Sequence, residues 1–98
     1  MTLHIDLQDG FQNDAVVIRV DGKQVYSKQD VSTDARISRA DALEAQASSN
    51  EVTVDVELPK KHIHASQKVR PGTTPNVGIS LNDGKPEFRV QSEVFRYM

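Results

Sequence analysis

Two histidines and two carboxylates have the types and spacing that could support chemistry in this sequence. His62 and His64 stand two positions apart, and Asp55 and Glu57 repeat that spacing earlier in the chain. Residues two apart in a β-strand share one face of the sheet. If the two segments pair antiparallel through a turn at 59–60, Glu57 faces His62 and Asp55 faces His64.

Imidazole nitrogens and carboxylate oxygens together suit zinc or another first-row divalent ion. The hypothesis is a metal site on this strand face, formed by His62, His64, Asp55 and Glu57, with Glu44 beyond them if its segment is also a strand. The alternative is a solvated face on which alternating charges fix the register of the two strands, and we favour this alternative. In either case, carboxylates opposite imidazoles favour the charged histidine and make the face sensitive to pH.

No motif for enzymatic chemistry accompanies these residues. The sequence has no cysteine, which excludes a cysteine nucleophile, and it contains neither a Gly-x-Ser-x-Gly segment nor another recognisable nucleophile motif. Ser66 lies two residues from His64, but proximity on an exposed strand does not activate a hydroxyl. Gly72 and Gly78 do not belong to a phosphate-binding loop. We therefore expect a protein without catalytic activity and without a cofactor.

The elements that would position these residues are strands. Apolar and polar residues alternate through 3–7 and, most clearly, through 52–58, which is the pattern of a half-buried strand. A tight turn at 59–60 would return the chain and pair Val56 with Ile63. The histidine face therefore depends on the register of one hairpin.

An Asp-Gly pair at 21–22 predicts another hairpin, because both residues tolerate the positive φ of a two-residue type I′ turn. This turn sets Ile18 opposite Val25 on one face and Val17 opposite Tyr26 on the other. Both faces then carry apolar pairs. We expect Val17 and Tyr26 to form an exposed patch that a second subunit or a partner covers.

A second Asp-Gly pair at 83–84 predicts a hairpin with Ile79 opposite Phe88. Pro86 falls in its returning strand and cannot donate a ladder hydrogen bond. That strand is therefore expected at the edge of a sheet.

Residues 39–47 leave helix and strand open. The composition of this segment favours a helix, which Ser38 could cap at Arg39. Pairing favours a strand, because a tight turn after it would set Ala45 opposite Val54 without a mismatch. We favour the strand and keep one short helix near 39–47 as the alternative.

Composition and charge exclude several classes of partner. The 12 basic and 14 acidic residues give a net charge of -2, which argues against nucleic acid as the main partner. A basic cluster, Lys60, Lys61 and His62 with Lys68 and Arg70, lacks aromatic residues for stacking and is expected to be a solvated turn. No segment approaches the ~20 apolar residues that span a bilayer, and residues 1–6 lack the pattern of a signal peptide. We therefore expect no membrane association and a cytoplasmic location.

Together these patterns predict a single all-β domain over 1–98, an antiparallel β-sandwich of about seven to eight short strands in the immunoglobulin-like or transthyretin-like manner. We expect a non-catalytic binding or interaction module that self-associates, with a homodimer possible, or binds a protein partner. Its interaction residues would be Val17, Tyr26, Phe95, Arg96 and Tyr97, because the aromatic C-terminal segment has the residue types of interface cores. Divalent-metal binding by the histidine and carboxylate face is the alternative function.

Overall fold

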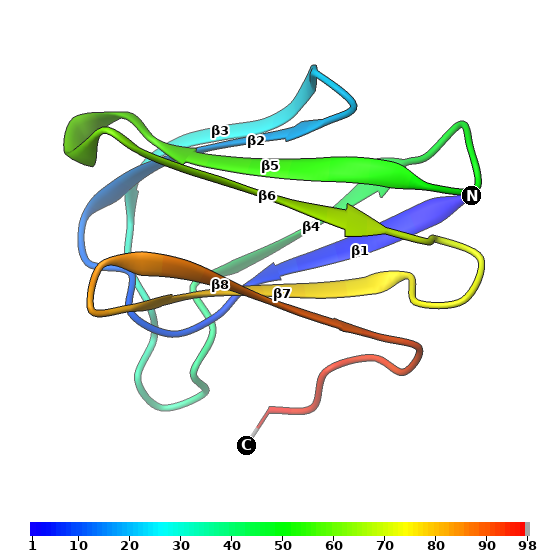
Figure 1. Ribbon diagram of the computed structural model, residues 1–98. Coiled ribbons are helices and arrows are strands. Elements are labelled where there is room, and N and C mark those ends of the chain that lie inside the picture. The colour runs from blue at the N-terminus through cyan, green and yellow to red at the C-terminus, as the bar shows by residue number, and fades with distance from the viewer. Residues whose placement is uncertain (98) are drawn as a thin grey trace.

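Period-two alternation gives this chain strands that pack as two β-sheets, face to face (Figure 1). The structure is a computed structural model and describes residues 1–97. Its elements within that range are β1 (Thr2–Leu7), β2 (Asp14–Val20), β3 (Lys23–Val31), β4 (Asp41–Gln46), β5 (Val52–Leu58), the 3-10 turn η1 (Pro59–Lys61), β6 (Ile63–Val69), β7 (Asn76–Asn82) and β8 (Lys85–Gln91). The predicted all-β sandwich is therefore confirmed. None of the helices among the described residues has the length and apolar character that crossing a bilayer requires.

Each sheet has four strands within the described residues. Sheet A has the order β4-β1-β7-β8, and sheet B has the order β3-β2-β5-β6. Neighbouring strands are antiparallel, with the exception of β1 and β7, which run parallel. In Figure 1 sheet B lies above sheet A, and the C-terminal segment passes below sheet A. The face of each sheet that meets the other sheet is called its inner face, and the opposite face is called its outer face.

Alternation puts one side of each strand into the space between the sheets. In β1, Leu3, Ile5 and Leu7 are fully buried, whereas His4 and Asp6 lie on the outer face. The inner residues of both sheets form a shared hydrophobic core. Each fully buried aliphatic side chain contributes roughly 1.5–3 kcal/mol. The pattern that predicts the strands is therefore also what stabilises the sandwich.

The β7–β8 hairpin has the predicted register. Ile79 lies opposite Phe88. Asp83 and Gly84 have positive φ angles of 53° and 78°, as a two-residue type I′ turn requires. β8 is an edge strand, as Pro86 predicted, so the missing ladder donor costs nothing in pairing.

The β2–β3 hairpin differs from its predicted register by one residue. Ile18 pairs with Tyr26 and Val17 pairs with Ser27, because a register shift near Val25 adds one residue to β3. A β-bulge of this kind re-aims the side chains that follow it. Tyr26 consequently faces the inner side and Val17 the outer side. The predicted patch of these two residues is not formed.

The β5–β6 hairpin differs from its predicted register by two residues. Val56 pairs with Ala65 instead of Ile63. The connection is longer than two residues, because η1 occupies Pro59–Lys61 and His62 follows it with a positive φ of 55°. A shift of two keeps the inner side chains on the inner face but changes every outer pair.

The segment that left helix and strand open is the strand β4, so the helix near 39–47 is wrong. The predicted partner of this strand is also wrong, since Leu43 lies opposite Ile5 and Ala45 opposite Leu3 in β1. Both sides of β5 are already occupied, by β2 and β6. Pairing with β1 buries Ala45 in the core, and this tertiary contact overrides the helix propensity of the segment.

Candidate functional site

The four residues of the predicted metal site do not converge. His62 lies in the turn after η1, outside the strand. His64 of β6 pairs with Glu57, and its Nε2 lies 3.5 Å from Asp55 Oδ1. Glu57 Oε1 instead accepts a 3.0 Å hydrogen bond from the Arg19 guanidinium. Residues 1–97 contain no group of three or more His, Cys, Asp and Glu side chains placed to hold a metal ion, so the metal hypothesis loses its geometric basis.

The side of the sandwich between β3 and β4, here the polar side, is closed by hydrogen bonds. The Tyr26 hydroxyl donates to Asp41 Oδ2 at 2.7 Å, and Lys28 Nζ lies 3.3 Å from the same oxygen. Burial, followed by the hydrogen bond and charge of Asp41, raises the pKa of Tyr26 well above its ordinary value. Burial also acts to raise the pKa of Asp41, but hydrogen bonds from Tyr26, the Ala42 amide and Lys28 hold it below its ordinary value. Tyr26 is thus engaged within the fold and joins the two sheets.

The opposite side, between β6 and β8, is closed by apolar side chains. Ile63 and Ala65 of β6 and Phe88 and Val90 of β8 pack against the core but remain half-buried. These four residues are called the apolar seam. In Figure 1 β6 lies above β8, and the two strands contact each other. The seam leaves apolar surface at the border between the sheets.

The edges of the two sheets differ in how well they resist another strand. Within the described residues the edge strands are β3, β4, β6 and β8. β3 has two register shifts and β8 contains Pro86, and both features discourage further pairing. The first residue of β4, Asp41, is held by its contacts with β3. β6 pairs with β5 residue for residue from Ile63 to Val69, as β4 does with β1. β6 contains no proline and forms no side-chain hydrogen bond to the other sheet within residues 1–97, so it is a regular edge that is free of both features.

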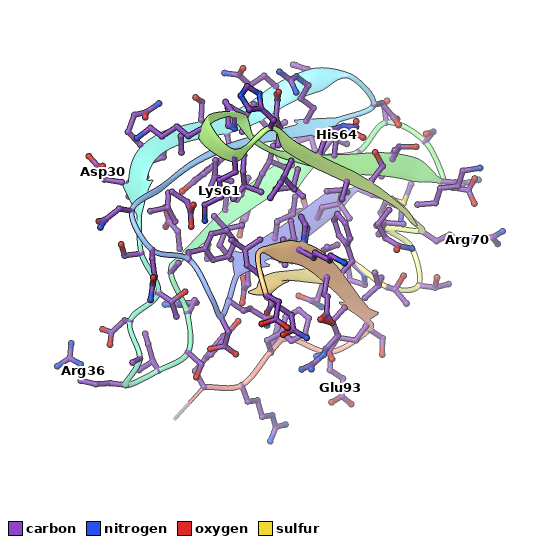
Figure 2. All side chains as sticks on the ribbon, turned by 60° about the vertical axis from the view of Figure 1, so that its left-hand side comes forward. Asp30, Arg36, Lys61, His64, Arg70 and Glu93 are labelled. Atoms are coloured by element: carbon purple, nitrogen blue, oxygen red, sulfur yellow. The ribbon has the colours of Figure 1, made fainter. Side chains whose placement is uncertain are left out.

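The surroundings of β6 are basic. The sequence has no Asp or Glu in 58–82, and the cations of this stretch are Lys60, Lys61, Lys68 and Arg70. Lys61 Nζ forms a 2.7 Å ion pair with Asp14, a carboxylate only 3% exposed. Arg70, in contrast, extends outward from the edge of the molecule in Figure 2. Lys60 and Lys68 form no ion pair with any residue of 1–97. Arg70 lies 3.5 Å from Glu51, so the positive charge that the described residues leave without an ion pair is that of Lys68 in β6 and Lys60 in η1.

The segment 93–97, called the tail, lies on the outer face of sheet A. The Tyr97 hydroxyl donates to Asp6 Oδ2 at 2.6 Å and accepts a 3.1 Å hydrogen bond from Gln8 Nε2. The Arg39 guanidinium lies 5.1 Å from the centre of the Tyr97 ring, which is a cation–π distance. Burial, with the hydrogen bond to Asp6, raises the pKa of Tyr97 to about 12. The hydroxyl therefore stays protonated at neutral pH and keeps the tail attached to the sheet.

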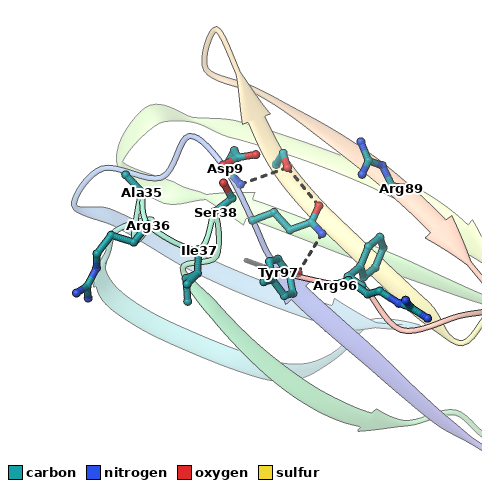
Figure 3. Close-up of a pocket in the computed structure, with 11 residues that line it drawn as sticks. Asp9, Ala35, Arg36, Ile37, Ser38, Arg89, Arg96 and Tyr97 are labelled. Carbon is teal, nitrogen blue, oxygen red and sulfur yellow. Dashed lines mark hydrogen bonds between the residues drawn. The ribbon is translucent and has the colours of Figure 1, made fainter.

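A pocket of about 260 Å³ opens between the tail and sheet A (Figure 3). Gln8 and Ser80 line it from the sheet, and Phe95 and Arg96 line it from the tail. Ser80 donates a 3.4 Å hydrogen bond to Gln8 Oε1. Gly78 makes room for the Gln8 side chain, because a Cβ at position 78 would lie 2.5 Å from Gln8 Oε1. The absence of a side chain at this one position therefore allows the polar lining to form.

This pocket was not among the sites predicted from the sequence. One signal was present, since a glycine such as Gly78 inside an apolar strand indicates close approach by another group. The identity of that group depends on the parallel pairing of β1 with β7, which brings together Gln8 and Ser80 from positions 72 residues apart. Such long-range pairing leaves no local pattern in the sequence.

The fold defines the class of this protein, a small all-β sandwich in which two four-stranded sheets pack together over residues 1–97. Comparisons with protein families, with curated proteins and with solved structures found no match to the chain. Its own surfaces therefore carry the information on function.

Proposed function

We propose that the chain is a non-catalytic interaction module that binds a protein partner by adding an extended, acidic segment of that partner to the edge strand β6. The proposal rests on the regular pairing of β6 with β5, which leaves one row of β6 backbone groups directed away from the sheet. The main chain of an added strand would hydrogen-bond to these groups, and side-chain contacts would supply the specificity.

The apolar seam supports the same mode of binding. A strand added beside β6 extends sheet B, so every second side chain of the added strand points to the inner side. There it would cover the exposed parts of Ile63 and Ala65 and approach Phe88. Each 100 Å² of apolar surface removed from water contributes roughly 2.5 kcal/mol. The seam therefore favours a partner with aliphatic residues at alternate positions.

Charge favours a different protein over a second copy of this chain. Two copies joined through β6 would bring their unneutralised lysines together, and like charges on neighbouring strands are destabilising. β5, the strand that already pairs with β6, has acidic residues on its outer face at Asp55 and Glu57 and valines on its inner face. In β5 the residue opposite Lys68 is Thr53, so the lysine has no carboxylate partner there. A partner segment with alternating aliphatic and acidic residues would supply such a carboxylate from the other side of β6.

The test uses a synthetic peptide with the sequence of residues 51–58, EVTVDVEL, as the probe. We expect it to shift the backbone amide signals of β6 in nuclear magnetic resonance spectra while the signals of β5 keep their native positions. Lys68→Glu should weaken binding by about five- to tenfold, since it replaces an attraction with a repulsion. Lys23→Glu at the β3 edge is the matched control, because it makes the same charge change on another exposed lysine.

Three results would contradict the proposal. The peptide could shift the signals of β3 or β8 instead of β6, or Lys23→Glu could weaken binding as much as Lys68→Glu. The third result is a homodimer in light scattering whose interface contains β6. A peptide in which the acidic residues are replaced by lysine should not bind, which separates charge selection from general adhesion of strands.

A further inference from the structure

The arginines of the chain are concentrated around the pocket beneath the tail. Four of the six lie there, namely Arg36, Arg89 and Arg96 in its lining and Arg39 against the Tyr97 ring. None of the six lysines lines it among the residues described. Arg36 is already engaged by Asp34, with Nε 3.1 Å from Oδ1 and Nη2 2.9 Å from Oδ2, and it points away from Tyr97 in Figure 3. Arg89 and Arg96 form no ion pair with any residue of 1–97.

We propose that this pocket binds a small molecule through an oxyanion group, a carboxylate or a phosphate, held by Arg89 and Arg96. The planar guanidinium group presents two parallel donors to such an anion, and lysine does not. The two arginines come from different elements, β8 and the tail, and both are solvent-exposed in the unbound protein. Both guanidinium groups are therefore free to turn towards an anion in the pocket.

The rest of the lining fits a small ligand with one anionic end. Asp9 is the one acidic side chain in the described lining, and its amide donates to Ser80 Oγ at 3.3 Å. Gln8 and Ser80 are engaged with each other, so the guanidinium groups and the Ser38 hydroxyl are the side-chain donors that the described lining offers to a ligand. Phe95 offers an apolar surface beside them. The volume of about 260 Å³ is just below the range for drug-sized ligands, which matches an anion carrying at most one ring.

The site depends on the attachment of the tail. Phe95 and Arg96 line the pocket only while Tyr97 keeps its hydrogen bonds to Asp6 and Gln8. A ligand that bridges Arg89 of the sheet and Arg96 of the tail would stabilise this attachment by mass action. This site is on the outer face of sheet A, so it is independent of the proposed partner site on β6 of sheet B.

The experiment titrates the whole chain with inorganic phosphate and, separately, with benzoate. The arginine Nε–Hε and backbone amide signals are followed by nuclear magnetic resonance at constant, low ionic strength, with chloride as the reference anion. We expect saturable shifts at Arg89 and Arg96 with at least one probe. Tighter binding of benzoate would identify an organic carboxylate as the source of the anion, and tighter binding of phosphate would identify a phosphate. Both probes reporting only the linear shifts produced by chloride would overturn the proposal.

Variants distinguish binding at this pocket from a general effect of the net charge of the protein. Arg89→Gln and Arg96→Gln should each weaken binding by about tenfold, because each removes a charge-assisted contact from an exposed position. Arg70→Gln is the matched control and should leave binding unchanged, since Arg70 lies at the opposite end of the molecule from Arg36 in Figure 2. Tyr97→Phe keeps every arginine but loosens the tail, and it should weaken binding several-fold. Equal losses in Arg70→Gln and Arg89→Gln would overturn the assignment.

Discussion

The two sides of the sandwich at which the edges of the sheets meet are closed by different kinds of contact, hydrogen bonds on one side and apolar contacts on the other. On the polar side, Tyr26 and Lys28 of β3 both reach Asp41 of β4. On the other side, the half-buried residues of the apolar seam meet between β6 and β8. A hydrogen bond requires one geometry, whereas apolar contact requires only coverage. The polar side therefore fixes how the sheets are aligned, and the seam stabilises them without specifying their alignment.

This difference shows where the protein can accept a partner. A strand that approaches β3 meets register shifts, and its neighbouring side chains are already hydrogen-bonded to β4. A strand that approaches β6 meets a regular edge beside apolar surface that is still partly exposed to water. Further coverage lowers the free energy at the seam, whereas at the polar side it would add little.

The largest effect is expected at the seam. Phe88→Ala should lower the free energy of unfolding by about 2 kcal/mol, less than the 3–5 kcal/mol typical of a fully buried phenylalanine, because this ring is half-buried. Urea unfolding of the variant measures the change. The control is Glu87→Ala on the outer face of the same strand, which should stay within about 0.5 kcal/mol of the original protein. Equal effects of the two substitutions would mean that the seam does not contribute to stability.

A smaller effect is expected on the polar side. Tyr26→Phe should cost about 1 kcal/mol, since it removes a hydrogen bond to a carboxylate at a partly exposed site. In a double-mutant cycle, Tyr26→Phe should couple with Asp41→Asn and should be additive with Phe88→Ala. Coupling between Tyr26 and Phe88 would show that the two sides do not act separately.

The smallest effect is a pH dependence that belongs to the polar side. The pKa of Asp41 is held below its ordinary value of 3.8 by hydrogen bonds from Tyr26, the Ala42 amide and Lys28, against the effect of burial. This contribution to stability is present above pH 3.8 and is lost as the pH falls through the lower, folded-state pKa. Between about pH 5 and about pH 2, Asp41→Asn should therefore lose less stability than the original protein, by under about 1 kcal/mol. If the two proteins show the same dependence of stability on pH in this range, Asp41 does not contribute to it.

Local turn chemistry decided which parts of the fold could be predicted. At Asp83 and Gly84 the turn residues alone define the register, and the β7–β8 hairpin follows them. The same kind of turn begins the β2–β3 hairpin, but a bulge then turns Tyr26 towards Asp41. That bulge is accompanied by a contact with a strand of the other sheet, and this contact cannot be predicted from the sequence of the hairpin alone.

The candidate sites were less predictable than the strands, because they depend on which strands become neighbours. The histidine face depended on a two-residue turn between β5 and β6. Because η1 makes the connection longer, His62 lies in the turn and not in the strand. The tail was recognised as aromatic, but its place on the sheet depends on Asp6 and Gln8 of β1. The basic residues near β6 were recognised as a cluster, yet the sequence did not show that they border a regular edge.

The parallel pairing of β1 with β7 has a consequence for the order in which the protein can assemble during synthesis. Every strand of sheet B lies within residues 14–69, so that sheet is complete before β7 emerges from the ribosome. β1 must meanwhile wait with one side unpaired, and such delayed, long-range pairing is slow and prone to aggregation. Pulse-labelling hydrogen exchange should find β5 protected before β1, and simultaneous protection would contradict this order. Pairing of β7 with β1 therefore ends the interval in which the unpaired side of β1 exposes the newly made chain to aggregation.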